Sequence, residues 1–240
     1  MVDLLIPGPE GKIEAKYTHN NKDNSPIVIL LHPDPRLKKI CTQVTNIDES
    51  IKKLCLDMID TMYKYSGVGL AAPQVGILKR VVVMDCSEEG EKNPITLINP
   101  EIVWSSKDDS KFEEGCLSIP HIREEIKRPS SVQVKFTDIC GISKESYFKG
   151  LWATCIQHEI DHLNGKLFID YLGPIKRSFI TKKMKKYKKE INIKLESGVL
   201  VIILSCDGQQ CLIKIQDKEG LIEQDLIFGV YIDEVIALRE

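Results

Sequence analysis

The segment from Leu151 to Leu163 constrains the fold of this chain more than any other. Its residues are mostly apolar on every side, which is typical of a helix surrounded by the rest of the protein. Yet His158, Glu159, Asp161 and His162 stand within it. Burying two imidazoles and two carboxylates is costly unless they are paired or bind a metal. We therefore expect a central, buried helix that binds a metal ion.

The spacing within this helix indicates how the ion is held. His158 and His162 are four residues apart, so their imidazoles lie on one face and can meet one divalent ion. Glu159 lies beside the first of them and is placed to act as a general base toward a water on that ion. A divalent ion lowers the pKa of such a water from 15.7 toward about 7.

A catalytic site of this kind needs a third protein ligand and one open position. The other histidines are His19, His32 and His121, and none continues the pattern of the long metzincin motif. A cysteine thiolate is the stronger alternative, but the chain has eight cysteines and their spacing does not choose among them.

The remaining patterns favour an α+β fold, because predicted strands precede the buried helix instead of alternating with helices. Residues 47–64 have apolar residues at helical spacing, and Asn46 with Glu49 is a plausible capping box. Predicted strands cover residues 27–30, 81–84, 95–98, 102–104 and 132–136. Residues 174–195 form a second long helix, with Ile175, Phe179, Met184, Tyr187, Ile191 and Leu195 on its apolar face and a strongly basic opposite face.

Composition excludes several classes of protein. The formal net charge of −2 gives the whole molecule no strong attraction for DNA or an anionic membrane. No apolar run approaches the ~18 residues that span a bilayer, and no secretory or transit signal is visible, so we expect a cytoplasmic protein. Its cysteines are then expected to be reduced thiols.

Three segments together resemble the peptide deformylase family. They are Gly67-Val68-Gly69-Leu70-Ala71-Ala72-Pro73-Gln74, Glu114-Gly115-Cys116-Leu117-Ser118 and Gln157-His158-Glu159-Ile160-Asp161-His162. The resemblance implies a deformylase-like fold, with antiparallel or mixed sheets around a central metal-binding helix and a basic C-terminal helix. It covers residues 27–195 as a catalytic domain, and leaves residues 1–26 as an N-terminal extension and 196–240 as an appendage of short strands (199–204, 212–215 and 226–232).

The resemblance also implies a role for each site residue. Cys116 joins His158 and His162 as the metal ligands, with Fe2+ as the ion and Zn2+, Ni2+ or Co2+ as substitutes. Glu159 is the general base, while the Gln74 side chain and the Leu117 backbone N–H stabilise the oxyanion. Substrate-binding positions are Val68, Gly69, Gly115, Arg123, Leu151 and Cys155. Asp161 is expected to pair with a basic residue such as Arg128.

The implied reaction is metal-dependent hydrolysis of the formyl group on the N-terminal formyl-methionine of nascent polypeptides, which releases formate. The basic helix 174–195 is expected to bind the ribosome transiently. Two rival hypotheses remain: a metallopeptidase that uses the same two-histidine helix, and an inactive deformylase-like module that binds the ribosome or RNA.

Overall fold

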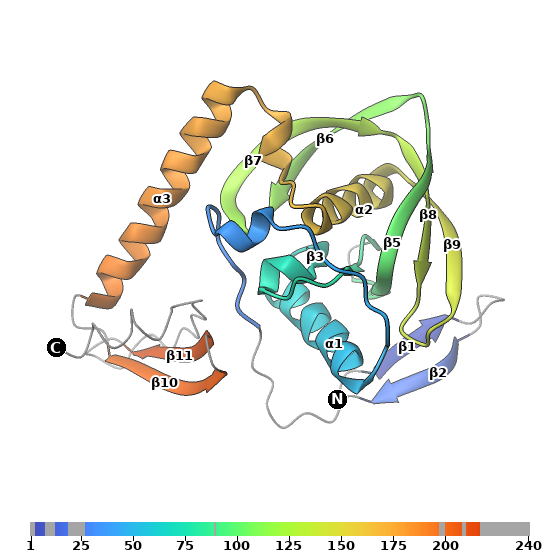
Figure 1. The fold of residues 1–240 in the computed structure, drawn as a ribbon, viewed down its shortest axis with the longest axis horizontal. Helices are drawn as coiled ribbons and strands as arrows, with labels where there is room; N and C mark the ends of the chain where they lie inside the picture. The colour runs from blue at the N-terminus through green and yellow to red at the C-terminus, as the bar shows by residue number, and fades with distance from the viewer. Residues whose placement is uncertain are drawn as a thin grey trace.

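The structure is a computed structural model that describes residues 3–7, 13–18, 27–88, 90–196, 200–207 and 210–216, with side chains over 27–88 and 90–188. Its centre is a five-stranded antiparallel sheet with the strand order β3-β4-β5-β8-β9. The bounds are β3 (Gly69–Ala71), β4 (Val81–Met84), β5 (Ile95–Ser105), β8 (Ser131–Thr137) and β9 (Ser143–Lys149). This α+β architecture agrees with the class expected from the sequence (Figure 1).

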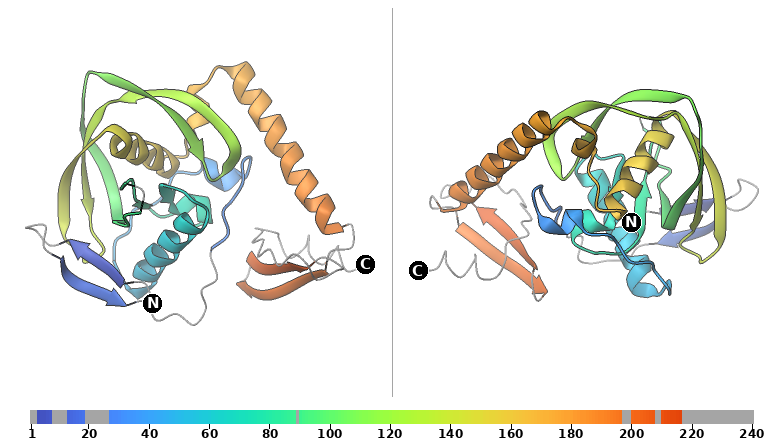
Figure 2. Two further views of the ribbon diagram at one scale, coloured as in Figure 1. Left: turned by 180° about the vertical axis from the view of Figure 1, so that it is seen from behind. Right: turned by 45° about the horizontal axis from the view of Figure 1, so that its top comes forward.

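Helices α1 (Glu49–Lys64) and α2 (Gly150–Leu163) use opposite faces of β4. Side chains alternate across a strand, so Val81 and Val83 pack with Met58 and Met62 of α1. Val82 and Met84 instead pack in the cluster that contains the apolar residues of α2. In the left view of Figure 2, α2 (gold) lies above α1 (cyan). Helix α2 is therefore buried in the centre, as its composition predicts.

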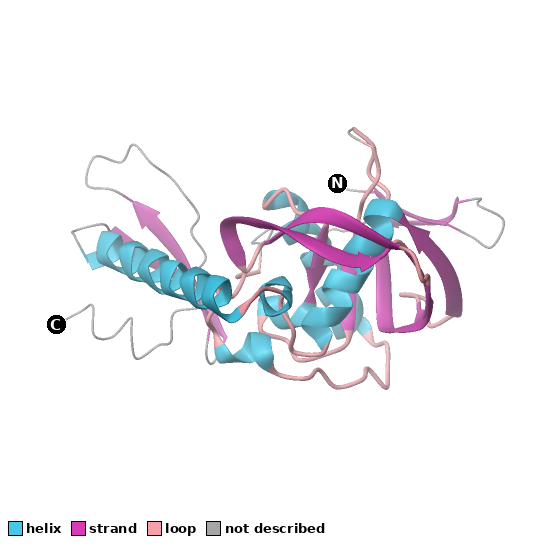
Figure 3. Cartoon of the chain, turned by 90° about the horizontal axis from the view of Figure 1, so that it is seen from above, coloured by secondary structure: helices cyan, strands magenta, loops and turns pink. Residues whose placement is uncertain are grey.

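A long two-stranded hairpin passes over α2. It consists of β6 (Asp109–Cys116) and β7 (Ile119–Pro129), which the sequence patterns did not predict. Figure 3 shows it crossing above the central helices. Its register shifts between Gly115 and Cys116, where the hairpin turns. The shift leaves Cys116 at the end of β6, next to His162 of α2.

Short 3-10 helices complete the core: η1 (Pro35–Lys38), η2 (Ala72–Val75) and η3 (Phe168–Tyr171). After η3, α3 (Pro174–Glu196) packs through Ile180 and Met184, which are 3% and 1% exposed. The predicted apolar face was therefore partly wrong, because Ile175 and Phe179 are 88% and 67% exposed. The side chains of residues 191 and 195 lie outside the described part.

Three smaller predictions also differ from the structure. Residues 27–30 form no strand, and the predicted strands 95–98 and 102–104 are one strand, β5. Helix α1 begins after Asp48, whose carboxylate accepts a hydrogen bond from Ile51 N, so Asn46 is not its N-cap. Within the predicted extension, β1 (Asp3–Pro7) pairs with β2 (Ile13–Thr18).

In the C-terminal appendage, β10 (Leu200–Asp207) and β11 (Gln210–Gln216) pair as an antiparallel hairpin, close to two of the predicted strands. The third, 226–232, lies outside the described residues. No helix among the residues described is both long and apolar enough to cross a membrane.

Candidate metal centre and active site

A cavity of about 870 Å³ opens beside α2, under the turn of the β6–β7 hairpin. It is lined by all but one of the residues predicted for the site: Val68, Gly69, Gln74, Gly115, Cys116, Leu117, Arg123, Leu151, Cys155, His158 and Glu159. The exception, His162, lies behind the cavity wall and is 1% exposed. Segments far apart in the sequence thus meet at one place.

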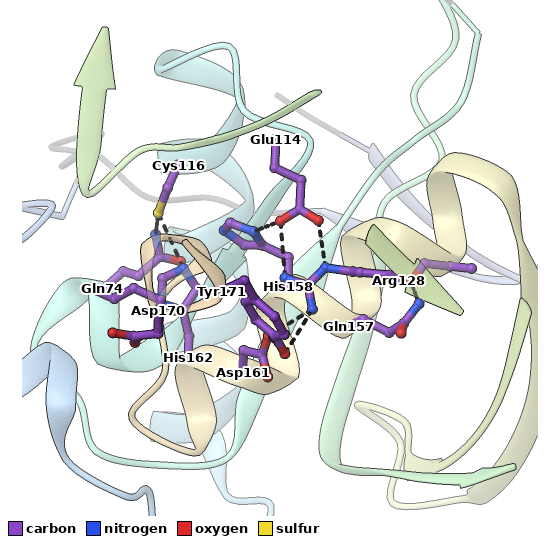
Figure 4. Close-up of polar contacts among 12 residues, drawn as sticks. Gln74, Glu114, Cys116, Arg128, Gln157, His158, Asp161, His162, Asp170 and Tyr171 are labelled. Atoms are coloured by element: carbon purple, nitrogen blue, oxygen red, sulfur yellow. Dashed lines mark hydrogen bonds and ion pairs between the residues drawn. The ribbon is translucent and has the colours of Figure 1, made fainter. Parts of the chain in front are cut away.

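Cys116 and His158, which line the cavity, form a compact group with the buried His162 (Figure 4). One ligand atom from each residue lies within 4.8 Å of the others. The Cys116 Sγ atom is 3.3 Å from His162 Nε2, and the two imidazole rings meet at 75° with their centroids 4.9 Å apart. One thiolate and two imidazoles suit a divalent transition metal, and three protein ligands leave a position open. These residues fit a single ion.

His158 is held in place by groups behind it. Its Nδ1 atom is 2.8 Å from Glu114 Oε2, so Nε2 is the atom left to face the cavity. Phe168 stacks on the imidazole at 6.0 Å between ring centroids. Such outer contacts fix the orientation of a metal-binding imidazole.

Arg128 anchors Glu114 in turn, and both side chains are only 4% exposed. Its Nη2 atom donates to Glu114 Oε2 at 3.0 Å, and its Nη1 atom donates to Asp161 Oδ2 at 2.8 Å. Tyr171 also donates to Asp161 at 2.8 Å (Figure 4). Burial raises the pKa of Glu114, but hydrogen bonds from His158 and Arg128 outweigh it and hold that pKa below its usual value. The carboxylate therefore stays ionised.

The expected pairing of Asp161 with Arg128 is present, whereas the position of Glu114 was missed. One signal for it was available. Glu114 and Cys116 are two residues apart on a strand and hence share a face, so a carboxylate near the metal ligands followed from strand periodicity. This inference requires β6 to be recognised as a strand, and its sequence pattern does not predict one.

Glu159 lies in the same turn of α2 as His158 and is 4% exposed. Its Oε2 atom has no hydrogen-bond partner among the described residues. Burial raises the pKa of this carboxyl group to about 7. Burial likewise holds the pKa of His162 well below its usual value, which favours the neutral imidazole that binds a metal.

Gln74 lines the cavity and is only 1% exposed. Its side-chain oxygen accepts a hydrogen bond from Ala71 N at 2.8 Å, which fixes the orientation of the amide. The Nε2 group then points at Cys116 Sγ (3.5 Å) and Ser118 Oγ (3.3 Å), on either side of Leu117. An N–H donor is thus directed into the ligand group.

The outer part of the cavity is more open and more apolar. Val68 and Leu151 are 46% and 45% exposed at its mouth, while Cys155 lies deeper at 6%. Arg123 faces solvent and is the cross-strand partner of Gly115. This combination suits an extended ligand with one apolar side chain that enters the cavity.

Comparison with known proteins gives one consistent result. The family model described as polypeptide deformylase matches residues 26–178. The chain is 47% identical to the peptide deformylase of Polynucleobacter necessarius over 165 residues, which cover 69% of this chain and 96% of that protein. It is 49% identical to the peptide deformylase of Bartonella henselae over 168 residues, which cover 70% and 94%.

Solved structures agree. A peptide deformylase from Legionella pneumophila matches with a TM-score of 0.66 and 45% identity, covering 70% of this chain and 98% of that one. A peptide deformylase from Ehrlichia chaffeensis in complex with actinonin matches with a TM-score of 0.65 and 43% identity, covering 68% and 98%.

Proposed function

The chain belongs to the polypeptide deformylase family, and on that premise we propose how its own residues carry out the family reaction. It is a metal-dependent hydrolase that removes the formyl group from the N-terminal formyl-methionine of nascent polypeptides and releases formate. The rival hypotheses of a metallopeptidase and of an inactive binding module are therefore set aside.

One observation gives the strongest support to this assignment of roles. Three ligand atoms from Cys116, His158 and His162 converge within 4.8 Å, and the carboxylate of Glu159 stands buried beside them with one oxygen unpaired. A divalent ion bound there supplies Lewis-acid activation of water and of the formyl oxygen. The rest of the chemistry belongs to side chains and backbone groups of the chain.

Glu159 moves the proton. Its carboxylate takes a proton from the attacking water and returns it to the departing amine, so that a free N-terminal methionine leaves. Gln74 Nε2 and the Leu117 N–H donate to the oxygen on which negative charge develops. Donors directed in this way are typically worth about 3 kcal/mol each in a hydrolase.

The substrate-binding residues orient the peptide. Gly69 has no side chain, which allows a peptide backbone to approach β3 closely. Gly115, near the end of β6, also lines the cavity, and we expect Arg123 to contact the peptide near the mouth. Val68, Leu151 and Cys155 form the apolar wall that receives the methionine side chain. The catalytic domain is residues 27–195, with residues 1–26 and 196–240 as additions.

We further propose Fe2+ as the ion in the cell, with Zn2+, Ni2+ or Co2+ able to replace it, because thiolate and imidazole ligands accept all of these. Metal analysis of protein purified without oxygen tests this. We propose a cytoplasmic location, where nascent chains are made, and transient ribosome binding through residues 174–195.

The decisive test is Glu159→Ala. We expect this variant to retain its metal and to lose formate release from formyl-Met-Ala-Ser by about 10²- to 10⁴-fold, the range of general acid–base catalysis. Glu113→Ala is the matched control, since Glu113 is an exposed carboxylate that also lines the cavity. Near wild-type turnover by Glu159→Ala would remove Glu159 from the mechanism.

A further inference from the structure

Two thiols converge on one backbone atom at the edge of the cavity. The Cys155 Sγ atom lies 3.4 Å from the carbonyl oxygen of Val68, and the Cys86 Sγ atom lies 4.0 Å from the same oxygen. Cys155 is on α2, whereas Cys86 follows the end of β4. Cys86 also packs against the apolar cluster that contains Cys155. None of the proposed catalytic roles uses Cys86.

The backbone around Cys86 is firmly held. The carboxylate of Asp85 accepts hydrogen bonds from Tyr63 Oη and from the backbone N–H groups of Ser87 and Asn93. The Asp85 N–H donates to the Val68 carbonyl oxygen at 2.9 Å. The position of Cys86 relative to Val68 is therefore set by the fold rather than by a loose loop.

The two thiols differ in access to solvent. Cys86 is half-buried, so a small reagent can reach it, whereas Cys155 is 6% exposed and faces the cavity. Burial raises the pKa of Cys41 to about 11 and that of Cys55 to about 12. Those two thiols react slowly because the thiolate is the reactive form. A hydrogen bond with Cys86, together with burial, also raises the pKa of Cys155 well above its usual value, so Cys155 reacts only second, with a mixed disulfide already held beside it.

We propose that Cys86 and Cys155 form a thiol-modification site, which a small-molecule disulfide such as oxidised glutathione converts into an intramolecular disulfide. The Cys86 sulfur, after losing its proton, attacks one sulfur of the reagent, and one glutathione leaves as the thiol. The Cys155 sulfur then loses its proton and attacks the Cys86 sulfur of the mixed disulfide, releasing a second glutathione. The protein loses two electrons and two protons, and the reagent gains both.

Closing this bond changes the substrate cavity. A disulfide requires the sulfur atoms to come within about 2.05 Å of each other, so Cys155 Sγ must move toward Cys86. Space there is tight: a Cβ built on Gly69 would lie 2.7 Å from Cys155 Sγ and 2.5 Å from Glu159 Oε1. The movement alters the cavity wall and the Val68–Gly69 backbone. The effect on turnover rests on the proposed function, but formation of the disulfide does not.

The test uses the full chain loaded with Zn2+, which has no redox chemistry of its own. After treatment with oxidised glutathione, peptides from a non-reducing digest are identified by mass spectrometry. We expect peptides joined through Cys86 and Cys155 and an unchanged zinc content. We also expect kcat/KM on formyl-Met-Ala-Ser to fall by about 10- to 10²-fold, since misplacement near 1 Å can cost roughly 10²-fold. Dithiothreitol should restore both the thiols and the activity.

Two variants sharpen the result. Cys86→Ser should keep its basal activity and become insensitive to the reagent, whereas Cys140→Ser, which removes an exposed thiol elsewhere, should respond like the wild type. The proposal is overturned if glutathione stays on Cys86 as a mixed disulfide, if the joined peptides contain Cys116, or if Cys86→Ser loses activity equally. A joined pair without a change in kcat/KM overturns the effect on the site. A protein that forms the pair but never deformylates its substrate contradicts the proposed function alone.

Discussion

Gly69 lines the cavity beside Glu159, the proposed general base. A Cβ at this position would lie 2.5 Å from Glu159 Oε1 and 2.7 Å from Cys155 Sγ, closer than real Cβ contacts allow. We therefore predict that Gly69→Ala displaces Glu159 and lowers kcat/KM for a formyl-Met peptide by roughly 10²-fold, the typical cost of misplacement near 1 Å.

Gly173→Ala provides the matched control, because a Cβ there meets nothing within 4 Å. Formate release measures the effect on both variants, and urea unfolding checks that each one folds. Equal activity of Gly69→Ala and Gly173→Ala would show that the close approach at β3 has no part in catalysis.

Sequence patterns predicted which residues form the site better than they predicted the tertiary contacts around those residues. The spacing of His158 and His162 placed both ligands on one helix face, because that follows from helix geometry alone. Selecting Cys116 needed the resemblance, since the contact between β6 and α2 is a tertiary one that no local pattern encodes. The burial of Gln74 likewise depends on tertiary contacts, with Cys116 and Ser118, that no local pattern encodes.

Arg128, on β7, connects the β6–β7 hairpin to helix α2. It forms ion pairs with Glu114 of β6 and Asp161 of α2. The side chains of Arg128 and Glu114 are 4% exposed, and that of Asp161 is 13% exposed. We predict that Arg128→Met destabilises the protein by about 3–5 kcal/mol, because removing one partner leaves buried charges without compensation. Metal affinity should also fall by about 10- to 100-fold, since Glu114 no longer holds His158 as firmly.

Urea unfolding and competition with a chelator measure these two effects. Lys127→Met is the control on the same strand, because Lys127 pairs with Asp109 at the exposed surface. Pairs of that kind are worth less than about 1 kcal/mol. Equal losses of stability in the two variants would contradict the role of Arg128.

The elements that the sequence predicted well are those with one clear apolar pattern. Helix α1 and strand β8 each have one apolar face, so periodicity locates them within a few residues. Helix α2 and strand β4 are mostly apolar throughout, which is typical of elements buried on all sides. The β6–β7 hairpin escaped because its strands alternate charged residues with few apolar ones, such as Phe112 and Ile126. Its buried residues Ile119 and Ile126 pack in one cluster with Phe168 of η3 and with Ile180 and Met184 of α3, contacts that no local pattern encodes.

Stability at acid pH depends on the whole molecule, because several carboxyl groups in separate regions have pKa values below their usual range. The pKa values of Asp34, Asp85 and Asp170 are all lowered. Burial raises the pKa of Asp85, but hydrogen bonds from Ser87 and Tyr63 outweigh it. A carboxyl group with a lowered folded pKa contributes stability at pH above its unfolded value, and the contribution is lost as the pH falls through the folded one.

We therefore predict that Asp85→Asn is less stable than the wild type at neutral pH and that this difference shrinks below the unfolded pKa of 3.8. Urea midpoints of both proteins from about pH 7 to about pH 3 measure it. Asp109→Asn is the control at an exposed carboxylate. A difference between wild type and Asp85→Asn that stays constant with pH would rule out the ionised carboxylate as its source.

Positive charge is concentrated on helix α3. The chain has a net charge of −2, yet no acidic residue lies between positions 174 and 189, where eight residues are Lys or Arg. One face of α3 is committed to the core through Ile180 and Met184, so the lysines around it face solvent. A surface of this kind attracts the phosphate groups of nucleic acids, with a marked dependence on salt, and this attraction is the physical basis of the ribosome binding that we propose.

We accordingly predict that reversing Lys182, Lys183, Lys185 and Lys186 to Glu reduces co-sedimentation with ribosomes and weakens its salt dependence, while turnover of a free formyl-Met peptide stays unchanged. A second variant, with the exposed residues Lys64, Lys107, Lys135 and Lys149 reversed, has the same net charge and should co-sediment nearly as well as the wild type. Equal losses in the two variants would mean that net charge alone drives the association. Unchanged co-sedimentation of the α3 variant would remove the helix from the interaction, because four reversed charges within one turn and a half leave too little positive potential for phosphate binding there.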